Sequence, residues 1–157
     1  MEKFTFFWSG PFSNWHPSPF EIDGVMYNCS EQWMMAEKAR LFEDKESLSK
    51  ILSAADPQDQ KAYGRRVKNF DKVKWEKIAK DVVYEGCHAK FTQNPDLKEA
   101  LLNTEGTTLV EASPEDFIWG IGLRKTDSSA LDRATWLGQN WLGEVLTKLR
   151  NDLIKSK

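Results

Sequence analysis

The chain has 157 residues, enough for one domain whose hydrophobic core can be stable without disulfides or metal ions. Hydrophobic residues make up 40% of it and charged residues 29%, a composition typical of soluble globular proteins. The formal net charge of −2 argues against electrostatic binding along a nucleic-acid backbone, although a local basic pocket stays open.

Two cysteines, Cys29 and Cys87, lack the spacing and the histidine partners of a zinc site, and they are too few for a disulfide framework. We therefore expect a reducing compartment. The start of the chain, MEKFTFFWSG, is too short and too aromatic for a signal peptide, and the chain contains no apolar run long enough to span a membrane. These features together predict a cytoplasmic protein that does not bind a membrane.

The first expected element is a short strand at Phe4–Trp8, aromatic and β-prone, which Gly10 and Pro11 end. The segment PFSNWHPSPF contains three prolines and is predicted to form an ordered loop. Within this loop, the amide of Asn14 can hold a sugar hydroxyl or the edge of a base. An Asx-turn, the commoner role of asparagine in loops, is the alternative for this residue.

The next elements are a hairpin and a helix that follows it directly. The two-residue turn Asp23-Gly24 lies between alternating runs and predicts a hairpin of residues 20–22 and 25–27. A helix is then expected to begin with Ser30 as its N-cap and Glu31 in its first turn, where a carboxylate is favoured by the helix dipole. The hairpin would set the orientation of this helix.

One face of this helix, in the stretch NCSEQWMMAEKARLF, has an unusual mixture of residues. Helical spacing places on that face Glu31, Met34, Met35, Lys38 and Phe42. Glu31 and Lys38 are then roughly 10 Å apart along the helix, at about 1.5 Å per residue. A purely structural helix would normally direct both charges to solvent. The structural alternative, a helix-start acid and a solvated lysine, stays open on this stretch alone.

A cluster of basic residues follows in the middle of the chain. Helical patterns are predicted here over residues 44–54, from Asp56-Pro57 onward, over residues 71–91 and from Asn94-Pro95 onward. Beside Gly64, between two of these helices, stand Arg65, Arg66 and Lys68. Such a cluster can hold a phosphate, with arginine giving a planar two-point contact, but most basic triplets are solvated surface.

The last third of the chain changes character. Residues 107–112 predict a strand, SPED a turn, and FIWGIGL an apolar run. Glycines at alternate positions of that run, Gly120 and Gly122, would let a ligand or another backbone come close. The polar segment KTDSSALDRATW is expected to be an exposed loop, before a final amphipathic helix in GQNWLGEVLTKLRNDLIK.

Two acids, Glu111 and Asp116, bracket the turn, and Trp119 lies three residues beyond the second acid. An acid beside an indole predicts a corner that stacks a base and binds a sugar. A solvent-facing strand position for Glu111 and turn formation by Asp116 are the alternatives. Gln139 and Asn140 stand at the start of the final helix, where free backbone N–H groups are expected to point outward.

Five blocks of the sequence, in this order, resemble the NADAR (YbiA-like) family of N-glycosidases: GPFSNWHPSPFEIDG, YNCSEQWMMAEKARLF, DPQDQKAYGRRVKNFD, LVEASPEDFIWGIG and GQNWLGEVLTKLR. The resemblance implies an α+β fold, a single compact and mostly helical domain over residues 1–157 with a small β-sheet or hairpin. It also implies hydrolysis of an N-glycosidic bond between ribose and a base-like group, with no metal or other cofactor.

The resemblance also implies roles for individual residues. The transition state of such a cleavage is oxocarbenium-like, so the carboxylate of Glu31 would lie near C1′, with Asp116 as a second carboxylate. Lys38 would either remain a charged donor or attack C1′ and form a transient imine. The expected substrate-binding residues are Arg65 and Lys68 for phosphate, Trp33 and Trp119 for the base, Asn14 and Asn140 for ribose or base, and Glu111 and Gly120 lining the same corner.

Three functions therefore remain in competition. The first is hydrolysis of early riboflavin-pathway intermediates, which releases ribose 5-phosphate. The second is removal of ADP-ribose from guanine in nucleic acid, and the third is a non-catalytic module that binds ADP-ribose or NAD. The mildly acidic charge favours a small-molecule, nucleotide-like substrate, and the pair of Glu31 and Lys38 favours an enzyme over a binding module.

Overall fold

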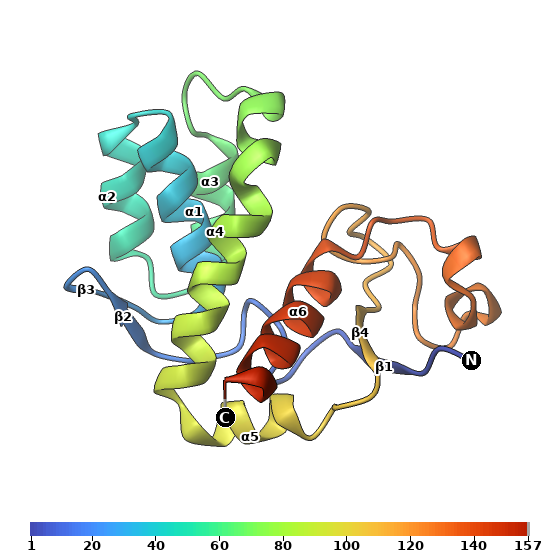
Figure 1. Ribbon diagram of the computed structural model, residues 1–157. Coiled ribbons are helices and arrows are strands. Elements are labelled where there is room, and N and C mark those ends of the chain that lie inside the picture. Colours follow the sequence, from blue (N-terminus) through green and yellow to red (C-terminus); the bar gives the residue numbers. More distant parts are fainter. Residues whose placement is uncertain (157) are drawn as a thin grey trace. The chain divides into compact units, whose positions relative to one another are not determined.

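The computed structural model describes residues 1–156, and these form two compact units (Figure 1). The central unit is Asn14–Asn94, and the terminal unit joins Met1–Ser13 to the chain from Pro95 onward. Within the described residues there are six α-helices, two short 3₁₀ helices and two two-stranded sheets, so the expected α+β, mostly helical fold is confirmed. None of the described helices combines the length and the apolar run that crossing a bilayer requires.

The central unit consists of a hairpin and four helices. Its elements are β2 (Phe20–Ile22), β3 (Val25–Tyr27), α1 (Ser30–Leu41), α2 (Lys45–Ser53), α3 (Pro57–Arg65) and α4 (Lys72–Gln93). Strands β2 and β3 are antiparallel, and Asp23 and Gly24 between them have φ angles of +50° and +80°. These angles suit the two-residue turn that the sequence predicted, since such turns need positive φ at both positions. Helix α1 packs against α2, α3 and α4 (Figure 1).

Two glycines allow other helices to pack closely on α1. A Cβ atom at Gly86 of α4 would lie 2.2 Å from Cδ1 of Trp33, and one at Gly64 of α3 would lie 2.0 Å from Sδ of Met35. The Trp33 ring is also fixed at its polar end, because its Nε1 donates a 2.8 Å hydrogen bond to the carbonyl of Val82. Trp33 therefore determines how α1 is rotated against α4.

The start of α1 differs from the sequence prediction. Ser30 is the first helical residue rather than the N-cap, and the N-cap residue, Cys29, gives no side-chain capping bond. The carbonyl of Asn14 accepts the Glu31 N–H at 2.9 Å instead. The expectation of a serine cap was wrong because a loop that is distant in sequence supplies the acceptor, which no local pattern reveals.

The terminal unit is built around a parallel pair of strands and a long helix. Its elements are β1 (Phe4–Phe7), α5 (Pro95–Leu102), β4 (Thr108–Glu111), the 3₁₀ helices η1 (Ser128–Leu131) and η2 (Arg133–Thr135), and α6 (Trp141–Lys155). Helix α6 packs against β4 and α5. The polar segment before α6 is exposed, as predicted, but it is organised by η1 and η2 and by ion pairs of Arg133 with Glu2 at 2.5 Å and with Glu144 at 2.7 Å.

We predict that the two helix glycines differ sharply in their tolerance of a methyl group. In Gly86→Ala the new atom meets the fixed Trp33 ring, so we expect a loss of about 2 kcal/mol in the free energy of unfolding, as for other overpacked cores. In Gly64→Ala the thioether of Met35 can rotate away, and the gain in helix propensity, about 1 kcal/mol, offsets the remaining strain. Urea unfolding of both variants measures the difference, and equal losses would contradict this account of Trp33.

Candidate active site

Glu31 and Lys38 lie on the same helix, two turns apart, as the sequence predicted. The side chain of Glu31 is buried, with 4% of its residue surface exposed, and Lys38 is about half buried. Burial lowers the pKa of Lys38, because it disfavours the charged ammonium. The negative charge of Glu31 opposes this shift, and the positive charge of Arg65 adds to it. Glu31 and Arg65 therefore both act electrostatically on Lys38.

An aromatic ring supports the Lys38 ammonium. Its Nζ lies 4.5 Å from the centroid of the Phe70 ring, within the range of a cation–π contact. The Phe42 ring meets Phe70 edge-on, with 5.5 Å between the two centroids. Phe70 was not among the residues predicted from the sequence, where its signal was an aromatic residue next to the basic cluster. A lysine with a lowered pKa and a fixed position can serve as a charged donor or as a nucleophile.

Asn14 lies beside Glu31, at the start of α1. Its backbone carbonyl accepts the Glu31 N–H, and the residue is more than nine-tenths buried. Within residues 1–156, its side-chain oxygen Oδ1 has no hydrogen-bond partner. Buried acceptors in native proteins are normally satisfied, so this oxygen is suited to accept a bond from a ligand hydroxyl. The predicted role of Asn14 in substrate binding is compatible with this geometry and stays a prediction.

The other predicted residues of the central unit have different surroundings. Arg65, the last residue of α3, is exposed and is the one whose charge reaches Lys38. The ammonium of Lys68 lies 3.8 Å from Glu46 and is largely exposed. Trp33 is packed in the core, as described above. Phosphate binding by Arg65 and Lys68 and base stacking on Trp33 stay predictions, and Arg65 has the position that best suits its role.

In the terminal unit, Asp116 organises its own turn. One carboxylate oxygen accepts the backbone N–H groups of Ile118 at 2.9 Å and of Trp119 at 2.8 Å. The Trp119 ring packs edge-on against Trp141, with 5.5 Å between centroids. A Cβ atom at Gly120 would lie 3.0 Å from the Glu111 carboxylate and from two backbone carbonyls, so this glycine permits a close approach of the chain to itself. Ligand binding by these residues stays a prediction.

Asn140 joins α6 to the sheet of the terminal unit. The residue is fully buried, and its backbone has a left-handed conformation with φ of +55°. Its Oδ1 accepts the Glu111 N–H at 3.0 Å, and its Nδ2 donates to the Leu109 carbonyl at 3.1 Å. Both polar groups of the side chain are therefore bonded to β4. The expectation of outward-pointing N–H groups at this helix start was wrong, since the N–H groups of residues 139–142 donate to carbonyls of residues 117–120.

Lys90 was also not among the residues predicted from the sequence, and it is fully buried in α4. Burial lowers its pKa to about 8, and the neighbouring thiols of Cys87 and Cys29 oppose the shift. Helical spacing does give a signal for this lysine, because Val83, Gly86, Cys87 and Lys90 stand at i, i+3, i+4 and i+7 on the apolar face of α4. Among the described residues, no group of three or more histidine, cysteine or acidic side chains is arranged to hold a metal ion.

Comparison with known proteins places this chain in an enzyme class. The chain is 44% identical over 146 residues to N-glycosidase R617 of Acanthamoeba polyphaga mimivirus. This match covers 90% of this chain and 86% of the relative. It is also 41% identical over 158 residues to protein irg-1 of Caenorhabditis elegans, in a match that covers 90% of this chain and 74% of that protein. The NMR structure of Escherichia coli YbiA superposes with a TM-score of 0.81 at 30% identity, over 99% of this chain and 88% of that one.

The fold and these relatives define a glycosyl hydrolase of the N-glycosidase type. A profile of the NADAR domain matches residues 6–154, and the chain belongs to the NADAR family. The predicted family is thereby confirmed. A further relative is the chloroplastic riboflavin biosynthesis protein PYRR of Zea mays, 31% identical over 157 residues, although the match covers only 23% of that longer protein.

We predict that the two charges near Lys38 shift its pKa in opposite directions. Arg65→Gln removes a repelling positive charge, so the pKa of Lys38 should rise, and Glu31→Gln removes an attraction, so it should fall. The limb of the pH–rate profile that reports the neutral amine should move to higher pH in the first variant and to lower pH in the second. An NMR titration of the Lys38 side chain measures this directly.

Arg66→Gln is the matched control for Arg65→Gln. It removes the same charge from the next residue, whose guanidinium lies 6.0 Å from the ring of Tyr63. We expect the pKa of Lys38 to stay close to that of the parent in this variant. Equal shifts from Arg65→Gln and Arg66→Gln would mean that the general charge of the surface, rather than the position of Arg65, sets the pKa.

We predict that Asn140→Ala lowers the stability of the terminal unit. It leaves the Glu111 N–H and the Leu109 carbonyl without their partner, and unsatisfied buried groups cost about 1–3 kcal/mol each. We therefore expect a loss of about 3 kcal/mol in urea unfolding, against less than about 0.5 kcal/mol for exposed Gln139→Ala. Parent-like stability with a raised KM would instead assign Asn140 to substrate binding.

Proposed function

We propose that this protein hydrolyses the N-glycosidic bond of phosphorylated N-ribosides, and that its substrates are early intermediates of riboflavin biosynthesis. The observation that carries the proposal is the pair of Glu31 and Lys38 on one face of α1, with the pKa of Lys38 lowered by burial. A helix that served only to fold the unit would gain nothing from keeping these charges out of solvent.

The proposed reaction uses both side chains. As the bond between C1′ and the base nitrogen lengthens, positive charge develops on the ribose ring, and the Glu31 carboxylate stabilises it. The base leaves with the bonding electron pair and takes up a proton from water. Neutral Lys38 can then bond to C1′ and open the sugar ring to an imine, which water hydrolyses to ribose phosphate and free amine. If Lys38 stays protonated, water attacks C1′ directly, and the ammonium serves as a hydrogen-bond donor.

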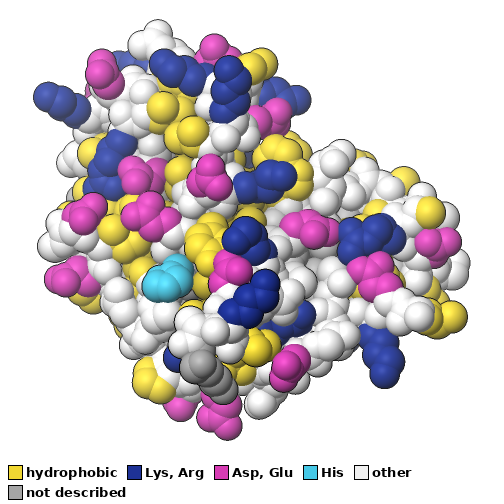
Figure 2. Space-filling view, in the orientation of Figure 1, with side chains coloured by type: hydrophobic (Ala, Val, Ile, Leu, Met, Phe, Trp, Pro, Cys, Tyr) yellow, Lys and Arg dark blue, Asp and Glu magenta, His cyan; other side chains and the backbone are white. Residues whose placement is uncertain are grey.

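Further features support the substrate class. Arg65 places a guanidinium near Lys38 that suits a phosphate, and Asn14 offers an acceptor for a ribose hydroxyl. On the face shown in Figure 2, basic and acidic side chains are interspersed, which suits a small molecule better than a nucleic-acid strand. The similarity to part of a riboflavin biosynthesis protein supports the same choice.

The proposal also includes the cellular setting and the domain. Both cysteines are free and buried, which suits the reducing environment of the cytoplasm. The match of the family profile across residues 6–154 supports one functional domain that comprises both compact units.

We predict that the parent protein releases ribose 5-phosphate from the ribosylamino-pyrimidine phosphate intermediate, measured by mass spectrometry. Lys38→Ala should slow turnover by about 100-fold or more, the usual range for loss of a positioned acid, base or nucleophile. Exposed Lys45→Ala serves as the control and should retain parent activity. Borohydride trapping of a sugar adduct in the parent, but not in Lys38→Ala, would select the imine route over the direct attack of water.

The same assay includes an ADP-ribosylated guanine oligonucleotide. Release of ADP-ribose from it, with no turnover of the pyrimidine riboside, would replace the riboflavin assignment by hydrolysis of ADP-ribosyl-guanine. Binding of ADP-ribose without turnover of either substrate would contradict the proposed substrate class and the catalytic role of Lys38.

A further inference from the structure

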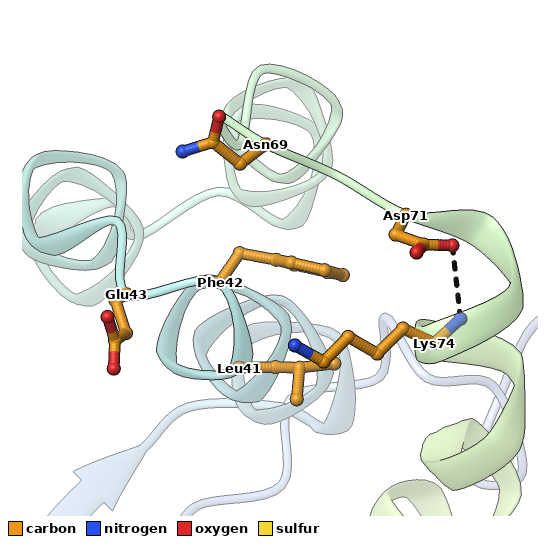
Figure 3. A pocket seen from close by; sticks show the side chains of 6 residues that line it. All are labelled: Leu41, Phe42, Glu43, Asn69, Asp71 and Lys74. Atoms are coloured by element: carbon orange, nitrogen blue, oxygen red, sulfur yellow. Dashed lines mark hydrogen bonds between the residues drawn. The ribbon is translucent and has the colours of Figure 1, made fainter.

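A groove lies at the C-terminal end of α1, inside the central unit (Figure 3). Its volume of about 330 Å³ is within the range of small-molecule sites. Figure 3 shows the Phe42 ring in the middle of the group, with the Lys74 side chain running below it. The side chains that line the groove are Leu41, Phe42, Glu43, Asn69, Asp71 and Lys74. The groove thus combines an aromatic face with carboxylates, an amide and an ammonium.

Two of the residues that line the groove have left-handed backbone conformations. Glu43 and Asn69 both have left-handed backbone angles, with φ of +56° and +62°. Asparagine tolerates this conformation, but glutamate adopts it at a cost. Next to Glu43, the buried carboxylate of Asp44 accepts the backbone N–H of Lys68 at 2.9 Å. This bond ties the loop that carries Asn69 to the end of α1. The left-handed Glu43 ends that helix in a Schellman cap, since the N–H of Glu43 donates to the Arg40 carbonyl at 3.1 Å and the N–H of Asp44 donates to the Ala39 carbonyl at 2.9 Å.

One aromatic ring connects the groove to Lys38. The ammonium of Lys38 lies 4.5 Å from the centroid of Phe70, and the same ring meets Phe42 of the groove with 5.5 Å between centroids. The Phe70 ring thus contacts both Phe42 of the groove and the Lys38 amine, to which the proposed function assigns the attack on C1′.

We propose that this groove is a subsite for a planar, amino-substituted heterocycle of the substrate. The Phe42 face would stack on the ring, and the carboxylate of Glu43 would accept bonds from its amino groups. Lys74 and the Asn69 amide would donate to the ring nitrogens or carbonyl oxygens. The heterocycle is either the leaving base or the distal base of a dinucleotide-like substrate. This inference rests on the proposed function for its link to Lys38, but the binding itself can be tested without turnover.

The test is an NMR titration of the ¹⁵N-labelled protein with three probes: a free diaminopyrimidine, ribose 5-phosphate and ADP-ribose. The base should shift the signals of the Asn69 amide and the Lys74 backbone, whereas the sugar phosphate should shift those of Lys38 and Arg65. Movement of the groove signals with the free base identifies the leaving base as the occupant. Movement with ADP-ribose alone identifies the distal base. Unchanged groove signals with all three probes would overturn the proposal, whatever the protein hydrolyses.

Two charge reversals in the first turn of α4 provide the matched variants. Lys74 lines the groove and Lys72 does not, while both are exposed and neighbour the same N-cap residue, Asp71. We expect Lys74→Glu to raise KM about fivefold with little change in kcat, and Lys72→Glu to behave as the parent. Glu43→Gly relieves the left-handed strain while removing the carboxylate, so it should raise Tm and weaken binding of the base. Equal effects of Lys74→Glu and Lys72→Glu on KM and on base binding would also overturn the proposal.

Discussion

The packing of α1 between three other helices is the constraint on which the central unit depends. The Trp33 ring packs directly on Gly86, where a side chain would clash with it, and its Nε1 donates to the Val82 carbonyl. A rotation or shift of α1 would break both contacts. Glu31 and Lys38 are carried by the same helix, and their positions are therefore set by the core. The precision that catalysis needs thus comes from packing, since interiors are close-packed and resist displacement. The helix that organises the unit thus also carries the two residues to which we assign the reaction.

The state of Lys38 results from a competition between three effects. Burial favours the neutral amine, Glu31 favours the ammonium, and Arg65 again favours the amine. A phosphate bound at Arg65 would partly cancel its repulsion, so substrate binding would itself alter the balance. The Phe70 ring holds the side chain in place and, as a cation–π partner, also favours the ammonium. This arrangement keeps both proposed routes, direct attack and donation, chemically accessible from one geometry.

The sequence predicted those features that depend on neighbours within a few residues. The turn at Asp23-Gly24 and the shared face of Glu31 and Lys38 follow from local conformational rules and helical period. The bonds of Asn140 to β4 and the cap that Asn14 gives to α1 could not be predicted, because their partners are 17 to 31 residues away. Polar residues at the ends of helices and strands marked where these elements begin and end. Whether such a side chain supports the fold or binds a ligand depends on partners that are distant in the sequence.

The two acids of the proposed chemistry have very different surroundings. One oxygen of Asp116 already accepts two backbone N–H groups of its own turn, whereas Glu31 is buried on a packed helix. Enzymes that cleave O-glycosides rely on a pair of carboxylates at a defined separation, one of which protonates a poor leaving group. The bond between ribose and a base-like amine in an unstable intermediate needs less assistance to break. In the proposed reaction, one carboxylate stabilises the developing charge and one amine acts at C1′, and α1 carries both side chains.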